Sequence, residues 1–314
     1  MITIIVPCKN RIDQLGECLD SILISIEEAK KLILDLEEEI IVVNDHSEEG
    51  FSTKVKEMYP NVIVLDSIGL GPGVARNYGI EKSKGKYIFF TDSDCIVDKN
   101  WIINGYNTFI KKSPIVIQGI PWLFQKNRNE VLGQNEEKLY EIMFSTYLDG
   151  EFSSMTDSRN LLFDREIVNI LGKEIFAEKQ DKATAESRVF GKKCISKGIN
   201  IYFDKNVKVY HEDSSNMLSV CKQKYRHGTG RVMIWDEKPK YEHLKFRYYD
   251  NPINNGVDKD YILPAHTAFL LGYYKHINNE VEFKNFMKFV RDVFEQYGRK
   301  IEDYNEILEL MKDE

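Results

Sequence analysis

The chain has 314 residues, of which 42% are hydrophobic and 30% charged, and this is the composition of a folded globular protein with one large domain or two modest ones. It excludes a disordered, collagen-like or coiled-coil protein. The 43 Lys and Arg residues against 50 Asp and Glu residues give a net charge of −7, which argues against a protein that holds nucleic acid by its phosphates. An acidic protein that binds a diphosphate must therefore supply positive charge locally, from side chains or a metal ion.

The start of the chain predicts a strand rather than a signal peptide, because residues 1–6 are mostly apolar and no cationic stretch precedes them. We therefore expect a cytoplasmic protein. The five cysteines are scattered and never spaced as C-x-x-C, which favours reduced thiols over a zinc site or disulfides. The apolar stretch from Tyr261 to Tyr274 is shorter than the roughly 20 residues of a spanning helix, so we expect at most peripheral contact with the inner face of a membrane.

Strand and helix patterns alternate over the first ninety residues. The expected strands are residues 2–6, 39–44, 61–65 and 86–90, and the expected helices are 13–36, 53–59 and 74–82. Continuously apolar strands separated by helices imply a parallel sheet covered on both faces. Ligands bind such sheets at the carboxyl ends of the strands. This rule points to residues 7–10, Asp45, the glycine turn at 69–73 and residues 92–94 as one site.

The pattern is less regular beyond residue 114. We expect a strand at 115–120 and then an irregular stretch at 121–157, with one helix at 134–147, that forms a lid or an acceptor platform. Beyond it we expect a helix at 186–196, strands at 200–203 and 207–210, a linker at 253–256 and two amphipathic helices within 281–311. These last helices would pack on the chain or form a homo-oligomer. The expected domains are residues 1–215, which hold the sheet, and a helical extension at 216–314.

Two carboxylates follow the strand at 86–90, where the sequence reads Phe90-Thr91-Asp92-Ser93-Asp94. At a strand end the i, i+2 spacing sends both aspartates the same way, so that they can share one divalent cation or one sugar-phosphate. Hard oxygen ligands suit Mg²⁺ or Mn²⁺ that bridges a diphosphate. Taken alone, Asp-x-Asp after a strand is equally consistent with a polar turn.

Three more features belong to the same edge of the predicted sheet. Asp45 ends a strand and is placed to accept from a base N–H or a ribose hydroxyl, although Asn-Asp-x-Ser is also a plain turn signature. The turn at 71–73 precedes a helix with Arg76 in its first turn, which favours an anion. His211 follows a strand and is either a third metal ligand or a solvated turn histidine.

Taken in order, these motifs resemble family 2 glycosyltransferases of the GT-A fold. The resemblance is carried by IIVPCKN at 4–10, IVVNDHS at 41–47, GVARNYGI at 73–80 and FTDSD at 90–94. It extends through Gly198 and His211 to QKYRHGTGR at 223–231, similar to the Q-x-x-R-x-G-x-G-R run of many bacterial members. It implies an α/β protein with a Rossmann-like, mostly parallel central sheet and helices on both faces, and an inverting transfer from a nucleotide-diphospho-sugar.

The resemblance also implies roles for single residues. Those assigned to the donor are Pro7, Cys8, Asn10, Arg11, Asp45, Arg76, Asn77, Asp92 and Ser93. Asp45 would hold the nucleoside, Arg76 would lie near base or phosphate, and Asp92 would meet the ribose or a metal-bound water. Asp94 would coordinate Mn²⁺ or Mg²⁺ directly, with His211 and Asp92 as further metal residues. The metal would neutralise the departing diphosphate.

The general base is open between two carboxylates. Family members usually place Glu-Asp at the start of the helix that ends in R-x-x-x-x-G, and counting back from Gly198 aligns this pair with Glu186 and Ser187. Lys193 stands where arginine is usual. Either Glu186 is the base, or Asp181 a turn earlier is, or the chain has lost robust activity. A plain helix-N-terminal carboxylate is the other interpretation of Glu186.

The expected acceptor side consists of three residues. Arg159 and Asn160 stand where the family often has a small polar segment followed by asparagine. Trp122 follows a strand and is placed to stack on a sugar ring, although packing alone would also explain it.

The sequence thus predicts a metal-dependent inverting glycosyltransferase of the hexosyl- or N-acetylhexosaminyl-transferase class. Its donor would be a UDP-sugar and its acceptor a hydroxyl group in glycan, polysaccharide or glycoconjugate biosynthesis. Two alternatives stay open. One is a catalytically weak or inactive nucleotide-sugar-binding protein, suggested by Ser187, and the other is a nucleotidyltransferase, whose glycine- and lysine-rich loop after the first strand is absent.

Overall fold

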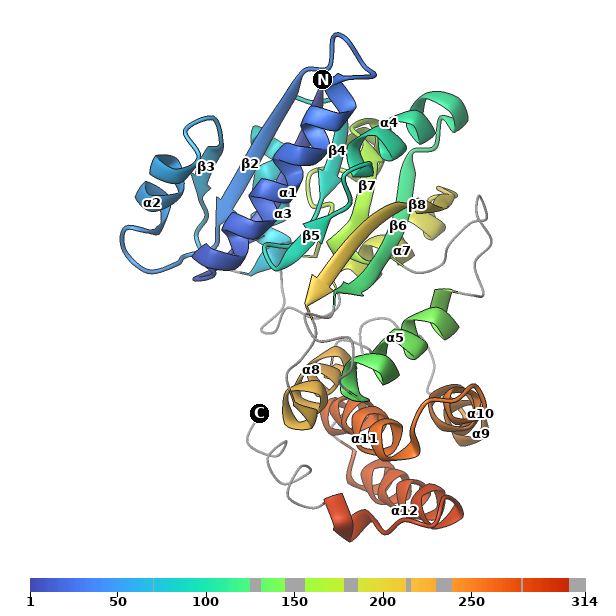
Figure 1. The fold of residues 1–314 in the computed structure, drawn as a ribbon. Coiled ribbons are helices and arrows are strands. Elements are labelled where there is room, and N and C mark those ends of the chain that lie inside the picture. Colours follow the sequence, from blue (N-terminus) through green and yellow to red (C-terminus); the bar gives the residue numbers. More distant parts are fainter. Residues whose placement is uncertain are drawn as a thin grey trace. The chain divides into compact units, whose positions relative to one another are not determined.

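The computed structural model describes residues 1–69, 71–124, 131–144, 156–177, 186–212, 216–229, 239–277 and 279–304. The chain divides into two compact units (Figure 1). Unit 1 is Met1–Phe124 with Tyr147–Glu212, and unit 2 is Gln125–Thr146 with Asp213–Glu314. The boundary at Glu212 lies near the expected one at 215, but residues 125–146 group with the helical unit and not with the sheet.

Among the described residues of unit 1, eight strands form one mixed sheet in the order β3-β2-β1-β4-β7-β6-β8-β5. The strands are β1 Ile2–Cys8, β2 Glu38–Asn44, β3 Ile63–Asp66, β4 Tyr87–Phe90, β5 Cys95–Val97, β6 Val116–Phe124, β7 Leu161–Asp164 and β8 Ile201–Glu212. The first four are parallel, β7 runs antiparallel to β4 and β6, and β5 runs antiparallel to β8. The carboxyl ends of β1, β2 and β4 therefore meet at one edge.

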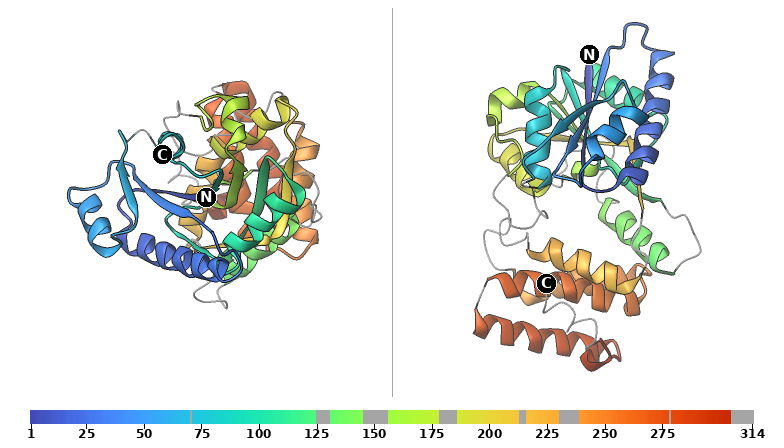
Figure 2. Two further views of the ribbon diagram at one scale, coloured as in Figure 1. Left: turned by 90° about the horizontal axis from the view of Figure 1, so that it is seen from above. Right: turned by 90° about the vertical axis from the view of Figure 1, so that its left-hand side faces the viewer.

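Helices cover both faces of this sheet. They are α1 Ile12–Lys30, α2 Phe51–Met58, α3 Pro72–Lys82, α4 Trp101–Lys112, α6 Glu166–Leu171 and α7 Glu186–Ser196, with a 3₁₀ turn η1 at Ser158–Asn160. Alternate residues of β1 supply the two cores: Ile4 packs with Leu19 and Trp101, and Ile5 packs with Ala75 and Phe190 on the other face. Figure 2 shows the blue helix α1 and the cyan helix α3 on opposite sides of the sheet.

Several elements differ from the sequence-based prediction. Helix α1 ends at Lys30 instead of near 36, and Leu34 beyond it is 93% exposed. The two strands expected at 200–210 are one strand, β8, whose pairing with β6 shifts register after Gly119. Strands β5 and β7 and helix α4 were not expected. The two strands have weak local signals, because they are only three and four residues long and are stabilised by pairing with distant strands.

Unit 2 is helical. It contains α5 Val131–Phe144, α8 Met217–Thr229, α9 Tyr241–Lys245, the π-helical turn η3 Phe246–Asp250, α10 Asn251–Asn254, α11 Lys259–His276, α12 Glu280–Gln296 and the 3₁₀ turn η4 Ile301–Tyr304. The expected linker at 253–256 is therefore partly helix α10. Helices α8 and α11 approach closely, since a Cβ atom at Gly228 would overlap the carbonyl oxygen of Phe269 and one at Gly272 would overlap that of Tyr225.

The apolar stretch from Tyr261 to Tyr274 forms most of α11, and nearly all of its side chains are buried in the core of unit 2. Its apolar character is thus explained by burial in the core of unit 2, and the expected peripheral membrane contact stays a prediction. Nowhere in the described part of the chain is a helix both long and apolar enough to cross a bilayer. Helix α12 likewise buries Phe286, Val290 and Phe294 within unit 2. The end of the second helix expected within 281–311 lies outside the described residues.

Candidate active site

The loops that follow β1 and β2 are joined by hydrogen bonds from backbone N–H groups to backbone and side-chain oxygens. The N–H of Asp45 donates to Cys8 O at 2.8 Å, and the N–H of Asn10 donates to Ser47 Oγ at 3.0 Å. Asn10 Oδ1 accepts from the N–H of Glu48 at 2.7 Å. Asn10 has φ +56°, a conformation that asparagine tolerates better than most residues. The Asn10 side chain, expected at the donor, therefore holds these two loops together.

Asp45 and the glycine turn lie together, as the order of the strands predicts. Asp45 is 6% exposed, and its Oδ1 accepts from the N–H of Gly71 at 3.4 Å. Pro7, Cys8 and Ser93 are buried beside them. Burial raises the pKa of the Cys8 thiol, which a hydrogen bond with Ser93 offsets only in part.

Arg76 joins two carboxylates that come from distant parts of the chain. Its side chain is 2% exposed, and its Nη2 donates to Asp92 Oδ1 at 2.6 Å while its Nη1 donates to Glu186 Oε1 at 2.9 Å. The guanidinium carbon lies 5.6 Å from the ring centroid of Phe176. Burial acts to lower the pKa of Arg76, but the two carboxylates outweigh it and raise that pKa. Arg76 thus lies in an enclosed position, and its expected contact with a base or phosphate stays a prediction.

Asp92 is affected by the same contact. Burial raises the pKa of Asp92 above its ordinary value, because the charge of Arg76 offsets it only in part and Asp94 adds to the rise.

Asn77 fixes the segment that carries Phe176. Its Nδ2 donates to Phe176 O at 2.8 Å, and its Oδ1 accepts from the N–H of Phe176 at 2.9 Å. One turn earlier in α3, a Cβ at Gly73 would overlap the carbonyl oxygen of Ala177. Asn77, expected at the donor, instead anchors residues 176–177 to α3.

Asp94 and His211 face each other because β5 pairs with β8, which sets Cys95 opposite His211. His211 Nε2 lies 3.5 Å from Asp94 Oδ2, and the guanidinium of Arg11, at the start of α1, contacts the same oxygen. Burial acts to raise the pKa of Asp94, but His211, Arg11 and Arg159 outweigh it and leave that pKa well below its ordinary value. A carboxylate oxygen and an imidazole nitrogen suit Mn²⁺.

The third expected metal residue, Asp92, is engaged by Arg76. Among the residues that the structure describes, no group of three acidic, histidine or cysteine side chains is arranged around one metal position. The structure therefore brings together the pair Asp94 and His211 and not the full expected set.

Asp157 is a site residue that the sequence reasoning missed. Arg159 binds it through two parallel hydrogen bonds, Nε to Oδ1 at 3.0 Å and Nη2 to Oδ2 at 2.6 Å. Burial acts to raise the pKa of Asp157, but Arg159 and Arg188 outweigh it and lower that pKa. The signal in the sequence is an aspartate that caps a short turn, since Asp157 also accepts from the N–H of Arg159.

Asn160 lies in the core. It is 0% exposed, its Oδ1 accepts from Trp101 Nε1 at 2.9 Å, and its Nδ2 donates to the carbonyl oxygens of Ile120 and Val207 at 2.9 Å. These three bonds occupy the amide, so the expected contact with an acceptor is not available to Asn160. Its role is to tie α4, β6 and β8 together.

Two expected residues cannot be placed. Asp181 lies outside the described residues, and so does the side chain of Trp122, whose backbone pairs with Tyr210 in the sheet. Glu186 is described: it opens α7, and its side chain is 12% exposed.

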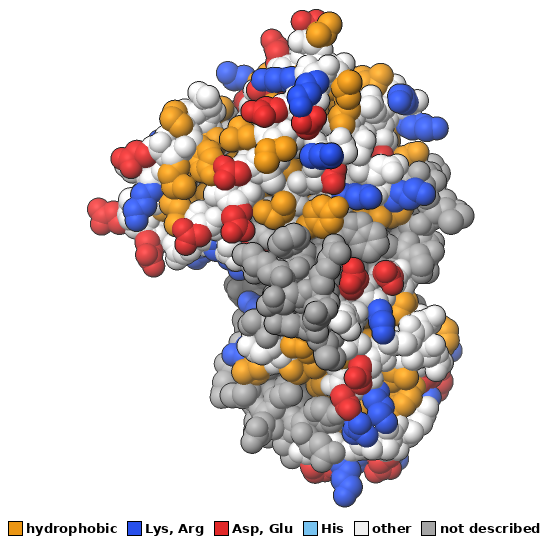
Figure 3. Space-filling model, viewed as in Figure 1, with side chains coloured by type: hydrophobic (Ala, Val, Ile, Leu, Met, Phe, Trp, Pro, Cys, Tyr) orange, Lys and Arg blue, Asp and Glu red, His pale blue; other side chains and the backbone are white. Residues whose placement is uncertain are grey.

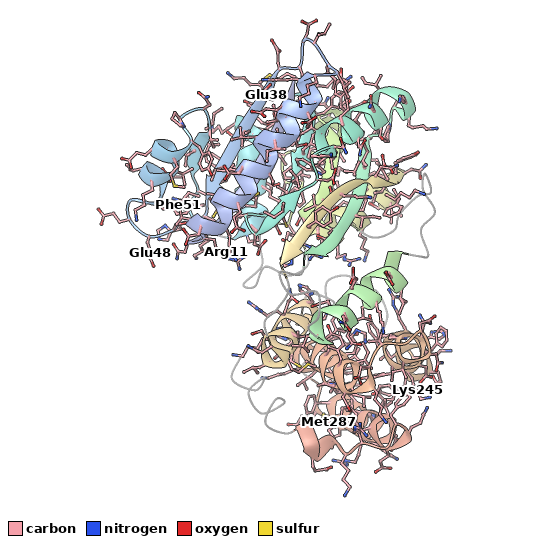
Figure 4. All side chains as sticks on the ribbon, in the orientation of Figure 1. Arg11, Glu38, Glu48, Phe51, Lys245 and Met287 are labelled. Atoms are coloured by element: carbon pink, nitrogen blue, oxygen red, sulfur yellow. The ribbon has the colours of Figure 1, made fainter. Side chains whose placement is uncertain are left out.

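The charged groups gather at the end of unit 1 where Figure 4 labels Arg11 and Glu48, opposite the end with Glu38. A separate cavity of about 640 Å³ adjoins α3 and is lined by residues that include Asp66, Tyr78, Arg165 and Lys173. Asp45, Asp92, Asp94 and Glu186 are not part of its lining, so we do not assign the donor to it.

Unit 1 has the GT-A fold, as its similarity to solved glycosyltransferase structures shows. S. aureus TarS 1–349 in complex with UDP-GlcNAc is similar, with a TM-score of 0.54 and 15% identity over 95% of this chain and 92% of that one. The mannosyltransferase PcManGT from Pyrobaculum calidifontis, in complex with GDP-Man and Mn²⁺, has a TM-score of 0.51 and 14% identity over 88% of this chain and 74% of that one. At these identities the likeness shows the fold alone.

Residues 3–169 match the family model described as Glycosyl transferase family 2, and the chain belongs to this family. Poly(ribitol-phosphate) beta-glucosyltransferase from Bacillus spizizenii is 33% identical over 111 residues. The match covers 34% of this chain and only 17% of that protein's own length.

Proposed function

We propose that this chain is a metal-dependent, inverting glycosyltransferase that moves a sugar from a nucleotide-diphospho-sugar to an acceptor hydroxyl. Its support is the family match together with one observation: Asp45, the pair Asp94 and His211, and the Arg76-bound Glu186 come from four distant segments to one edge of the sheet. The UDP-GlcNAc and GDP-Man complexes of the similar structures favour a nucleoside-diphosphate sugar, and the Bacillus relative's name favours a poly(ribitol phosphate)-type polymer as acceptor. We place the reaction in the cytoplasm, where nucleotide sugars are made.

The metal would be held by Asp94 and His211. Their oxygen and nitrogen atoms lie 3.5 Å apart and suit Mn²⁺ or Mg²⁺. The bound ion supplies Lewis-acid stabilisation to the departing diphosphate. Asp45 would orient the nucleoside from the end of β2, and the backbone N–H groups at the start of α3 would face negative charge.

The acceptor hydroxyl must lose its proton to a base within hydrogen-bonding reach. Glu186 is the described candidate, because Oε1 accepts from Arg76 and Oε2 is left for that proton. Asp181 remains the alternative carboxylate. Because Ser187 stands where the family usually has aspartate, Glu186 is a stronger candidate for the base than its neighbour at the start of α7.

The test is release of UDP from UDP-glucose and UDP-GlcNAc, with Mn²⁺ and with EDTA, by the full chain and by its Glu186→Gln and Asp181→Asn variants. We expect Mn²⁺-dependent release and a loss of about 100-fold or more in the variant that lacks the base. Glu166→Gln is the matched control, because Glu166 opens α6 as Glu186 opens α7 but is exposed and far from the paired carboxylates in the sequence.

Each alternative has its own result. Pyrophosphate in place of UDP would identify a nucleotidyltransferase. Thermal stabilisation by a UDP-sugar without any turnover, equal in wild type and both variants, would identify a binding protein.

A further inference from the structure

One guanidinium spans the two halves of the candidate site. Arg76 donates to Asp92, which follows β4, and to Glu186, which opens α7. Glu186 lies 110 positions after Arg76 in the chain. The structure offers no other described hydrogen bond to either of these two side chains. The distance between the proposed donor-side carboxylate and the proposed base is therefore set by Arg76.

The surroundings of Arg76 hold its guanidinium in one orientation. Its side chain is 2% exposed and lies over the ring of Phe176, whose backbone is held at both N–H and C=O by Asn77. A buried cation is costly unless it is paired, and a planar guanidinium offers N–H groups in a fixed fork that can bind two carboxylates at once. The Nε of Arg76 has no partner within the described part of the chain, so both bonds to carboxylates use the terminal nitrogens.

We infer that Arg76 is a positioning residue of the transferase: it sets Glu186 against Asp92, so that the base and the donor are aligned before the acceptor arrives. The inference rests on the proposed function. Without Arg76, the partly exposed carboxylates of Asp92 and Glu186 would lose the cation that now binds both of them, and their repulsion would move Glu186 from its place. A displacement of about 1 Å at a reacting group is enough to cost about 100-fold in rate.

The experiment compares Arg76→Gln, Arg76→Lys and, as the control, Arg165→Gln, using UDP release with Mn²⁺ at temperatures where circular dichroism shows each variant folded. Arg165 is a comparable arginine of unit 1 that donates to Gly85 O at 2.7 Å and Ser83 Oγ at 2.6 Å and touches neither carboxylate. We expect Arg76→Gln to lower kcat about 100-fold with KM for the UDP-sugar within about threefold, and Arg165→Gln to lower Tm with kcat kept.

A double-mutant cycle separates positioning from structure. If Arg76 acts through Glu186, Arg76→Gln lowers kcat by less than about threefold once Glu186→Gln is present. Arg76→Lys keeps the charge but binds one carboxylate at a time, so we expect it to fold and to lose about tenfold in kcat.

Additive losses in the cycle, or a folded Arg76→Lys with wild-type kcat, would overturn the inference while the proposed function stands. A wild-type chain without Mn²⁺-dependent UDP release would overturn both.

Discussion

Four of the described carboxylates of the site lie against an arginine. Arg76 serves Asp92 and Glu186, Arg11 contacts Asp94, and Arg159 holds Asp157. A chain of net charge −7 thus carries a cluster in which four negative groups meet three permanent positive ones. Because each of these arginines is already paired with a carboxylate, the further positive charge that a bound diphosphate needs would have to come from elsewhere, as the proposed metal ion would supply.

Arg11 would compete with the proposed divalent cation for Asp94, because Arg11 contacts the Oδ2 of that carboxylate that lies beside His211. We expect Arg11→Gln to tighten Mn²⁺ binding severalfold and His211→Ala to weaken it by about tenfold or more, measured by electron paramagnetic resonance of free Mn²⁺. Lys9→Gln is the control, since Lys9 is an exposed neighbouring cation. Weaker Mn²⁺ binding in Arg11→Gln would contradict this competition.

Asn160 should matter for stability and not for acceptor binding. Asn160→Ala leaves Trp101 Nε1 and two carbonyl oxygens unpaired in the core, so we expect the free energy of unfolding to fall by about 3 kcal/mol. Urea unfolding measures this loss. A normal unfolding midpoint together with a raised KM for the acceptor would show that Asn160 contacts substrate after all.

At the level of elements, α8 and α11 depend on glycine where they meet. The expected family run at 223–231 includes Gly228, and the structure gives this glycine a packing role, because its Cα faces the backbone of Phe269 without room for a side chain. The motif therefore contributes to unit 2 through its glycine as well as through any polar residue.

Gly228→Ala tests this packing. The added methyl group would overlap the carbonyl oxygen of Phe269, so we expect a loss of about 3 kcal/mol in the stability of unit 2. Gly16→Ala is the matched control inside helix α1: its nearest neighbour would be Tyr59 Oη at 3.4 Å, so we expect stability unchanged or raised by up to about 1 kcal/mol. Equal effects of the two variants in thermal unfolding would refute the packing role.

At the scale of the molecule, the chain forms two compact units with separate cores. Their described cores contain no common residue, since one set centres on the sheet and the other on α11. On the face in Figure 3, Lys and Arg side chains alternate with Asp and Glu and build no continuous basic field.

The two units should respond differently to acid. His266 in α11 has its Nδ1 at the carbonyl oxygen of Tyr248, and burial lowers the pKa of His266 to about 4, with Lys224 lowering it further and Glu136 acting against it. In the unfolded chain His266 takes up a proton below about pH 6.5, whereas in the folded unit 2 it stays neutral down to about pH 4. The free energy of unfolding of unit 2 therefore falls as the pH drops from about 6.5 to about 4.

We expect the free energy of unfolding of unit 2 to fall by about 3 kcal/mol between pH 6.5 and pH 4, and we expect His266→Gln to remove most of this pH dependence. Differential scanning calorimetry at several pH values measures it. A transition of unit 2 with the same pH dependence in both proteins would show that His266 is not the responsible group.

The sequence by itself determined the order of strands and helices over the first ninety residues and the edge where Asp45, Asp92 and Asp94 lie. Apolar periodicity and turn residues are local signals, and the carboxyl ends of parallel strands necessarily share an edge. The four family motifs fall in this part of the chain, and the family match confirms the membership they predict.

Only the tertiary structure decided which side chains meet. Three contacts join residues that are far apart in the chain: Arg76 with Glu186, Asp94 with His211, and Asn160 with Trp101. No local sequence pattern predicts such contacts. Asn77 and Asn160 have the polarity of ligand-binding residues, but their amides satisfy buried backbone and indole groups that would otherwise be left unpaired. The need to pair every buried polar group thus separates the residues that hold the site from those that face its substrates.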